Sequence, residues 1–216
     1  MTGYGAVIDG TLGPALAALA EDTGLRIDGA VLERFQRHLD LVRTWNRQLG
    51  LVSAGDVEHL AARHLLDALS LIPLVLRFAG PSATCLDIGS GGGFPAIPIK
   101  CALPAITLTI IERNVRKVGF LQKVTAAVNA GDVAIVHGSF PEVAMPTPPD
   151  IITARAVERP ERVVPEILDW MPAGCAFLCQ TTPPPVDPAV FHVEHIQDRW
   201  RREAWRRGEL YAISRS

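Results

Sequence analysis

A run of glycines behind a short apolar segment is the part of this chain best suited to hold a ligand. Residues 84–88 are largely apolar, and Gly89-Ser90-Gly91-Gly92-Gly93 follows them, ending in Phe94-Pro95. Because no Cβ intervenes, such a turn lets a ligand approach the backbone closely. The dinucleotide fingerprint has a third glycine where this chain has Phe94. A bulky ring there favours an adenosyl ligand without a pyrophosphate over a nicotinamide dinucleotide.

Two carboxylates accompany the loop. Glu112 ends the next apolar run, and an acid about 20 residues beyond such a loop can accept hydrogen bonds from both hydroxyls of a ribose. Asp87 precedes the loop and can receive either a ligand ammonium, directly or through water, or the amides of the loop itself. The alternative is that the glycines only make a tight turn and that Glu112 is an ordinary exposed acid at a strand end.

The elements that position these residues follow from the hydrophobic pattern beyond Gly80-Pro81, where short apolar runs alternate with helix-length segments. This alternation is typical of βαβ units and predicts an α/β fold, a doubly wound, mostly parallel, Rossmann-like sheet. An antiparallel C-terminal strand pair, 190–196 with 209–213, closes it. The other expected strands are 84–88, 106–112, 133–137, 150–154 and 174–180, with helices near 95–102, 115–129 and 160–171.

The first eighty residues predict helices. Apolar residues recur at spacings of three and four over 29–47, with Asp28 as the N-cap. A second helix is expected after Asp56, with Arg63 and Asp67 as a surface pair, and a short one near 12–20. The chain therefore divides into an N-terminal helical extension, 1–80, and a cofactor-binding domain, 81–216.

Composition sets limits on the partners. The net charge of −2 over 216 residues gives no global attraction to a polyanion, so any RNA contact must be local. No segment approaches the roughly 18 uninterrupted apolar residues of a membrane span. The cysteines lack metal-ligand spacing and are expected to be reduced core residues of a cytoplasmic protein without a metal. They are Cys85, Cys101, Cys175 and Cys179.

Residues 199–207 contain five arginines and two tryptophans. Basic side chains interleaved with aromatics can hold phosphates and stack on bases. The competing interpretation is a solvated hairpin strand whose tryptophans pack on the sheet, and a single short patch on an acidic protein favours it.

Taken together, these motifs resemble the RsmG (GidB) family of bacterial methyltransferases, which modify N7 of a guanine in 16S ribosomal RNA. The resemblance runs from about residue 39 to the C-terminus. The matching positions are Trp45-Asn46, Arg63, His64 and Asp67, Gly89 to Pro95, Glu112, Arg116-Lys117, Phe120-Leu121, Asp150 and Arg155-Ala156.

The resemblance implies a class I methyltransferase that binds S-adenosylmethionine. Its partner would be 16S ribosomal RNA or the small ribosomal subunit, and we expect a cytoplasmic monomer. The residues that it assigns to catalysis are Arg155, His64 and Asp67. The expected cofactor-binding residues are Asp87, Gly89, Ser90, Gly91, Phe94, Glu112, Phe140 and Arg155.

Departures from the family pattern concern polar positions. Where the family has a glycine after Phe-Pro, this chain has Ala96. The family's acid near the adenine corresponds to Phe140-Pro141 here, with Glu142 one position later. The family's Lys-Gly after the fifth strand corresponds to Cys179-Gln180. They leave open a paralogue with another substrate, or a non-catalytic nucleotide-binding or ribosome-associated module.

The expected chemistry asks little of the side chains. Transfer of a methyl group from a sulfonium is an in-line displacement, and guanine N7 already carries an unprotonated lone pair. No general base is therefore required, and alignment can provide most of the rate. Arg155 is better assigned to the cofactor end or to a phosphate than to N7, because the product guanine gains positive charge. The alternatives are an arginine paired with Asp150 or Glu158, and a structural His64.

Overall fold

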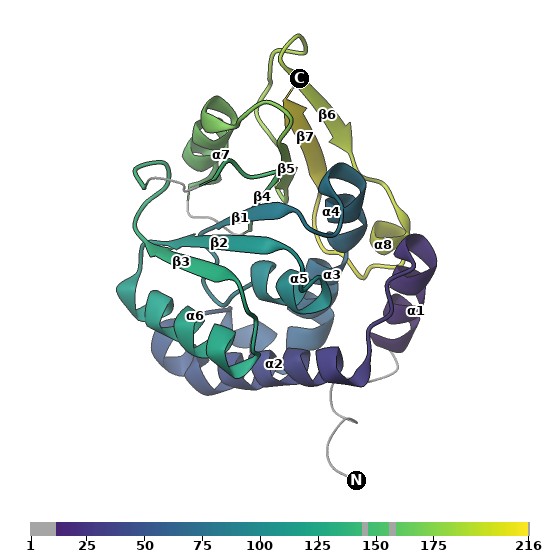
Figure 1. Ribbon diagram of the computed structural model, residues 1–216, viewed down its shortest axis with the longest axis vertical. Helices are drawn as coiled ribbons and strands as arrows, with labels where there is room; N and C mark the ends of the chain where they lie inside the picture. Colours follow the sequence, from purple (N-terminus) through teal and green to yellow (C-terminus); the bar gives the residue numbers. More distant parts are fainter. Residues whose placement is uncertain (1–11, 144–146, 156–158, 216) are drawn as a thin grey trace.

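The computed structural model describes residues 12–143, 147–155 and 159–215. At its centre lies a seven-stranded sheet with the order β3-β2-β1-β4-β5-β7-β6 (Figure 1). The first five strands are parallel, and β7 runs antiparallel to both β5 and β6. The strands are β1 (Thr84–Ile88), β2 (Thr107–Glu112), β3 (Val133–His137), β4 (Ile151–Ala154), β5 (Ala176–Cys179), β6 (Phe191–His195) and β7 (Tyr211–Arg215). The predicted α/β class and the antiparallel C-terminal pair are confirmed.

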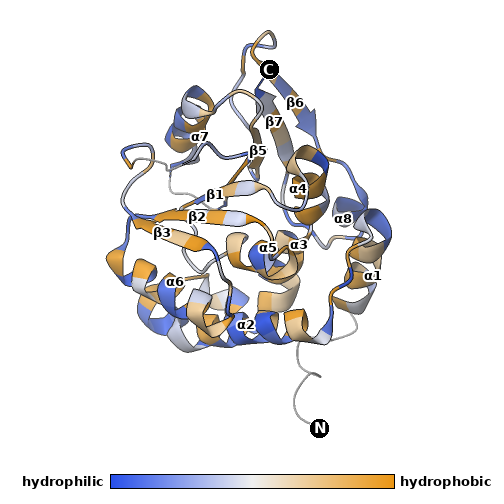
Figure 2. Ribbon diagram, viewed as in Figure 1, coloured by the Kyte–Doolittle hydropathy of each residue, from blue (hydrophilic) through white to orange (hydrophobic). Residues whose placement is uncertain are grey.

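Helices cover both faces of the sheet and bury its central strands, such as β4 and β5, on both sides. Cys85 and Ile110 point into a cluster with the N-terminal helices, α5 (Ala96–Ala102) and α6 (Val115–Ala127). Leu86 and Ile111, one position along each strand, point into a second cluster with α7 (Pro160–Trp170). The apolar strands and helix faces that meet in these layers are visible in Figure 2.

The N-terminal helices begin as the sequence predicts. After α1 (Leu12–Thr23), the long α2 (Gly29–Leu49) starts at Asp28, whose side chain accepts a hydrogen bond from the Val31 amide. It ends at Gly50, which adopts the left-handed conformation. The buried stripe of α2 belongs to the same apolar cluster as the first face of the sheet. The division of the chain at residue 80 stays a prediction.

The second predicted helix is broken. A 3₁₀ helix η2 (Ala54–His59) leads into a π turn η3 (Ala61–Leu65), followed by α3 (Leu66–Leu69) and α4 (Ile72–Ala79). The expected surface pair of Arg63 and Asp67 is wrong: Arg63 pairs with Asp56 instead, at 2.5 Å, and Asp67 is buried. A π turn alters the angular spacing of side chains, and such turns are frequent at functional sites.

The segment 199–207 is mainly structural. It begins as a short helix α8 (Arg199–Arg202), in which Trp200 is buried and meets Trp205 edge-on. Arg206 is also buried, pairs with Asp198 and donates to the Ile196 carbonyl. The expectation that the tryptophans pack is confirmed, although the segment forms a helical turn where a strand was expected.

Candidate active site

The glycine loop lies at the C-terminal end of β1. Gly89, Gly91 and Gly93 have φ angles of +73°, +54° and +85°, a region that other L-residues rarely adopt. A Cβ added to Gly93 would lie 2.9 Å from Ile97 Cγ1 and 3.1 Å from His38 Nε2. The Gly89 amide donates to the Ile111 carbonyl at 2.8 Å, which ties the start of the loop to β2.

Glu112 supports this loop directly. Its Oε2 accepts a hydrogen bond from the Gly91 amide at 3.0 Å, and its Oε1 accepts one from the Asn114 amide at 2.9 Å. The side chain is buried, so Glu112 is not the ordinary exposed strand-end acid of the alternative interpretation. A carboxylate has about four lone-pair sites, so both oxygens can accept further hydrogen bonds.

Asp87 lies beneath the loop and is fully buried. Thr153 on β4 donates its hydroxyl to Asp87 Oδ1 at 2.6 Å. Within the described part of the chain, the buried Asp87 Oδ2 and Ser90 Oγ make no hydrogen bond of good geometry, although the two side chains are close enough for Ser90 to act on the pKa of Asp87. Burial raises the pKa of Asp87 to about 6. This acid therefore has an acceptor atom left for a donor in the loop.

A stack of rings connects the loop to the N-terminal helices. His38 of α2 is buried and its Nε2 donates to the Gly92 carbonyl at 2.7 Å, while its ring stacks on Phe94 at 4.5 Å. The other neighbour of Phe94 is His64, with ring centroids 5.2 Å apart. Burial lowers the pKa of His38 to about 4, so this imidazole is neutral at physiological pH.

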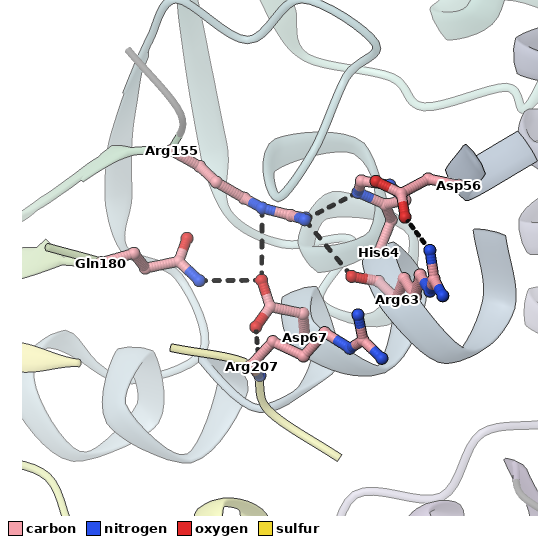
Figure 3. A pocket seen from close by; sticks show the side chains of 7 residues that line it. All are labelled: Asp56, Arg63, His64, Asp67, Arg155, Gln180 and Arg207. Carbon is pink, nitrogen blue, oxygen red and sulfur yellow. Dashed lines mark hydrogen bonds and ion pairs between the residues drawn. The ribbon is translucent and has the colours of Figure 1, made fainter. Parts of the chain in front are cut away.

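His64 also lines a polar pocket with a volume of about 250 Å³. It gathers residues from η2, η3, α3, the ends of β4 and β5, and the segment before β7 (Figure 3). The lining residues are Asp56, Arg63, His64, Asp67, Arg155, Gln180 and Arg207.

Arg155 and Asp67 form the centre of this pocket. Arg155 Nε lies 3.3 Å from Asp67 Oδ2, and the same oxygen accepts a hydrogen bond from Gln180 Nε2 at 2.9 Å. The Arg207 amide donates to Asp67 Oδ1 at 3.2 Å. Both oxygens of this buried carboxylate are therefore engaged. Of the alternative partners of Arg155, Asp150 instead accepts from the Thr84 amide, and Glu158 lies outside the described residues.

His64 is held as a neutral donor. Arg155 Nη2 lies 2.6 Å from His64 Nδ1, and because guanidinium can only donate, Nδ1 must accept and Nε2 must carry the proton. Nε2 faces Asp56 Oδ2 at 3.4 Å. Burial and then the positive charge of Arg155 lower the pKa of His64 to about 4. The hydrogen bond from Arg63 lowers the pKa of Asp56 to about 2.

Phe140 is not among the residues that line the pocket. It packs edge-on against Trp170 of α7, with ring centroids 5.3 Å apart, and belongs to the second apolar cluster. Phe140 follows β3, whose last residue His137 pairs in register with Glu112. Glu142 is exposed.

Neither a metal centre nor a membrane span is found among the described residues. No group of three or more His, Cys, Asp or Glu side chains there could hold a metal ion. None of the described helices is long and apolar enough to cross a bilayer. All four cysteines are buried and free.

Comparison with known proteins adds a family to this geometry. The model of the GidB family, rRNA small subunit methyltransferase G, matches residues 31–178. The chain belongs to this family. Among its relatives, ribosomal RNA small subunit methyltransferase G of Anaeromyxobacter dehalogenans (strain 2CP-1) is 31% identical, and the match covers 80% of this chain and 76% of the relative. The Leuconostoc citreum protein of the same name is 30% identical, with 76% and 70% covered.

Solved structures agree on the fold. MtNAS, solved as a mutant in complex with S-adenosylmethionine, is 14% identical with a TM-score of 0.55, and the match covers 95% of this chain and 91% of MtNAS. The yhhF protein of Escherichia coli is 18% identical with a TM-score of 0.53, and 68% and 83% are covered. At such identities the likeness concerns the fold alone.

In this GidB family member, the predicted residues fall into two groups joined by Phe94. One group surrounds the loop, and the other lines the pocket. The members of the first are Asp87, Gly89, Ser90, Gly91 and Glu112, and those of the second are His64, Asp67 and Arg155.

Sequence reasoning missed several members of both groups. His38 could have been noticed as a lone imidazole within the apolar stripe of α2, between Phe35 and Leu39. Thr153 and Asp56 carried no recognisable signal. The sequence marks Gln180 only as a departure from the family pattern and Arg207 only as part of the basic segment 199–207, and both lie beyond residue 178, where the match to the family model ends.

Proposed function

We propose that this GidB family protein is an S-adenosylmethionine-dependent methyltransferase that methylates N7 of a guanine in 16S ribosomal RNA, acting as a monomer in the cytoplasm. The observation that carries the proposal is the position of the loop and the pocket. Both lie at the carboxyl ends of β1 and β4, where the strand order reverses. Ligands bind at this crevice in open α/β sheets.

The residues around the loop fit the cofactor. The unpaired Asp87 Oδ2 and Ser90 Oγ suit the ammonium and carboxylate of an amino acid, and Glu112 has lone pairs left for ribose hydroxyls. The glycines leave the backbone open to close approach. Phe140, beyond the end of β3, is assigned to the adenine side of this site. When bound, S-adenosylmethionine supplies a methyl group activated by its sulfonium.

The protein's own contribution is alignment. Guanine N7 needs no deprotonation, and the neutral His64 and the engaged Asp67 suit a pocket that orients a base rather than one that removes a proton. Arg155 touches both side chains and sets their geometry, so we assign it to the base side of the site and not to the cofactor end that the resemblance implied. Its charge is partly balanced by Asp67, which limits repulsion of the methylated, cationic guanine.

The RNA contact is local, as the acidic composition requires. Arg207 is exposed at the pocket, and no ion pair of its guanidinium is found among the described residues. We assign this side chain to a phosphate beside the target nucleotide. The other arginines of the segment have partners: Arg199 pairs with Glu21 and Asp22, and Arg201 pairs with Glu209.

The test combines binding and transfer. Calorimetric titration with S-adenosylhomocysteine should give a dissociation constant that Glu112→Ala raises about tenfold or more, equivalent to about 1.4 kcal/mol. Transfer of labelled methyl groups to small subunits lacking the modification should then yield 7-methylguanosine, detected by mass spectrometry of the digested 16S RNA.

Each negative outcome has its own meaning. Binding of the cofactor without transfer to RNA or subunits would indicate a non-catalytic module. Transfer to another atom or molecule would indicate a paralogue with a different substrate. Failure to bind S-adenosylmethionine would refute the enzyme.

A further inference from the structure

We propose that Gln180 selects guanine, its side-chain oxygen accepting a hydrogen bond from the exocyclic amino group of the target base. This inference rests on the proposed function and adds the residue that distinguishes guanine from other purines. Gln180 directly follows β5, next to Arg155 at the end of β4, and lines the polar pocket.

The orientation of the Gln180 amide is fixed by chemistry. Its nitrogen lies 2.9 Å from Asp67 Oδ2, which also contacts Arg155 Nε. A carboxylate paired with a guanidinium is ionised and can only accept hydrogen bonds, so the amide must turn its NH₂ group to Asp67. Its oxygen therefore points away from Asp67, as Figure 3 shows.

That oxygen is the acceptor left over in the pocket. Gln180 Oε1 is buried and has no hydrogen-bond partner among the described residues. The carboxylate of Asp67 is engaged at both oxygens, and in Asp56 Oδ1 accepts from Arg63 while Oδ2 faces His64 Nε2 at 3.4 Å. The remaining buried nitrogens of the pocket, Arg155 Nη1 and His64 Nε2, are donors, and the latter faces Asp56. A buried acceptor without a partner favours a ligand that brings a donor.

Guanine provides this donor on the edge away from its reacting atom. With N7 directed at the methyl group, the exocyclic N2 amino group lies across the ring system from the reaction. Adenine has no such group, and N2 is the donor that separates G·C from A·T pairs in the minor groove. A site built to satisfy a polar group on the substrate strongly rejects the analogue that lacks it, because its own buried atom is then left unpaired.

The experiment removes each side of the proposed hydrogen bond. After mass spectrometry locates the methylated guanosine, 16S RNA is ligated with either guanosine or inosine at that position, since inosine lacks only the N2 amino group. Rates of methyl transfer are measured at limiting RNA for the wild type, Gln180→Met and Gln122→Met. The last variant is a control on the exposed face of α6.

We expect the wild type and Gln122→Met to prefer guanosine over inosine at least about tenfold in kcat/KM. Gln180→Met should lower the rate on guanosine to near the wild-type rate on inosine and abolish the preference. A variant that is slower on both RNAs but keeps the tenfold ratio would show a purely structural role and overturn the inference.

Other results are also decisive. A wild type that methylates inosine as fast as guanosine would overturn the inference while leaving the proposed function intact. A wild type that transfers no methyl group to N7 in either RNA would instead refute the proposed function, and the assignment of Gln180 with it.

Discussion

The glycine loop and the polar pocket face the same crevice but are built in opposite ways. The loop comes from one continuous stretch of chain, 89–93, and its shape depends on backbone angles and on Glu112. The pocket takes its side chains from segments as far apart as Asp56 and Arg207, and it is held by charged hydrogen bonds. Phe94, between His38 and His64, is the contact that joins them.

This difference predicts which substitutions impair each region. A loop shaped by its backbone tolerates changes around it but not an added Cβ. A change of one charged side chain in the pocket leaves the cofactor site intact but disturbs the alignment on which methyl transfer depends. Variants of the two regions should therefore separate cofactor affinity from transfer rate.

The largest effect is expected from Arg155→Lys. Lysine keeps the charge but lacks the planar fork that touches both Asp67 and His64, so the alignment of the pocket is lost. Transfer to ribosomal RNA should fall about 100-fold, with affinity for S-adenosylhomocysteine within about twofold of the wild type. Steady-state rates and calorimetry measure both. Arg162→Lys, in an exposed pair with Glu166 on α7, is the control. Equal losses in both quantities would mean that the regions are not separable.

Gly93→Ala tests the glycine loop and should weaken cofactor binding. At φ +85° an alanine is strained, and its Cβ would lie 2.9 Å from Ile97. Affinity for S-adenosylhomocysteine should fall on the order of 10- to 100-fold. Gly119→Ala is the matched control, because Gly119 lies on α6 with nothing within 4 Å of the added Cβ. Unchanged affinity of a folded Gly93→Ala protein would contradict the assignment of the loop.

The ring stack makes stability depend on pH. His38 and His64 both have a folded pKa of about 4 against 6.5 when free, so unfolding takes up protons and stability is lost as pH falls from about 6.5 to 4. Asp87, raised to about 6, acts in the opposite sense between 3.8 and 6. Two histidines outweigh one acid, so the free energy of unfolding should decrease on acidification, by up to about 1.4 kcal/mol per pH unit for each unopposed group.

Replacing one ring sharpens this test. His38→Gln removes one of the two titrating rings and should flatten the loss of stability between pH 6.5 and 4, measured by urea unfolding at several pH values. His137→Gln serves as the control, because His137 is exposed. An unchanged slope in His38→Gln would mean that folding does not lower the pKa of His38.

The smallest effect is expected at the rim of the pocket. Arg207→Ala should raise KM for RNA by about two- to fivefold and reduce the slope of log affinity against log salt by about 1, without changing cofactor affinity. Arg202→Ala, on the exposed side of α8, provides the comparison. Identical salt dependence of the two variants would argue against a phosphate contact at Arg207.

The sequence alone determined the α/β fold and the loop, because both depend on local patterns. Alternating apolar runs define the strands, and the glycines with the Phe-Pro ending define a turn whose neighbours along the chain are also its neighbours in space. Glu112 could be found because it lies at the end of the adjacent parallel strand, a spacing set by one βαβ unit.

The tertiary structure alone decided the pocket. The break at η3 turned Asp67 inward, where the periodic pattern had placed it on the surface beside Arg63. Gln180 and Arg207 reach Asp67 only because the C-terminal end of β5 and the segment before β7 lie against α3. Local propensity carries no information about such meetings, which follow from how the buried faces of distant segments pack together.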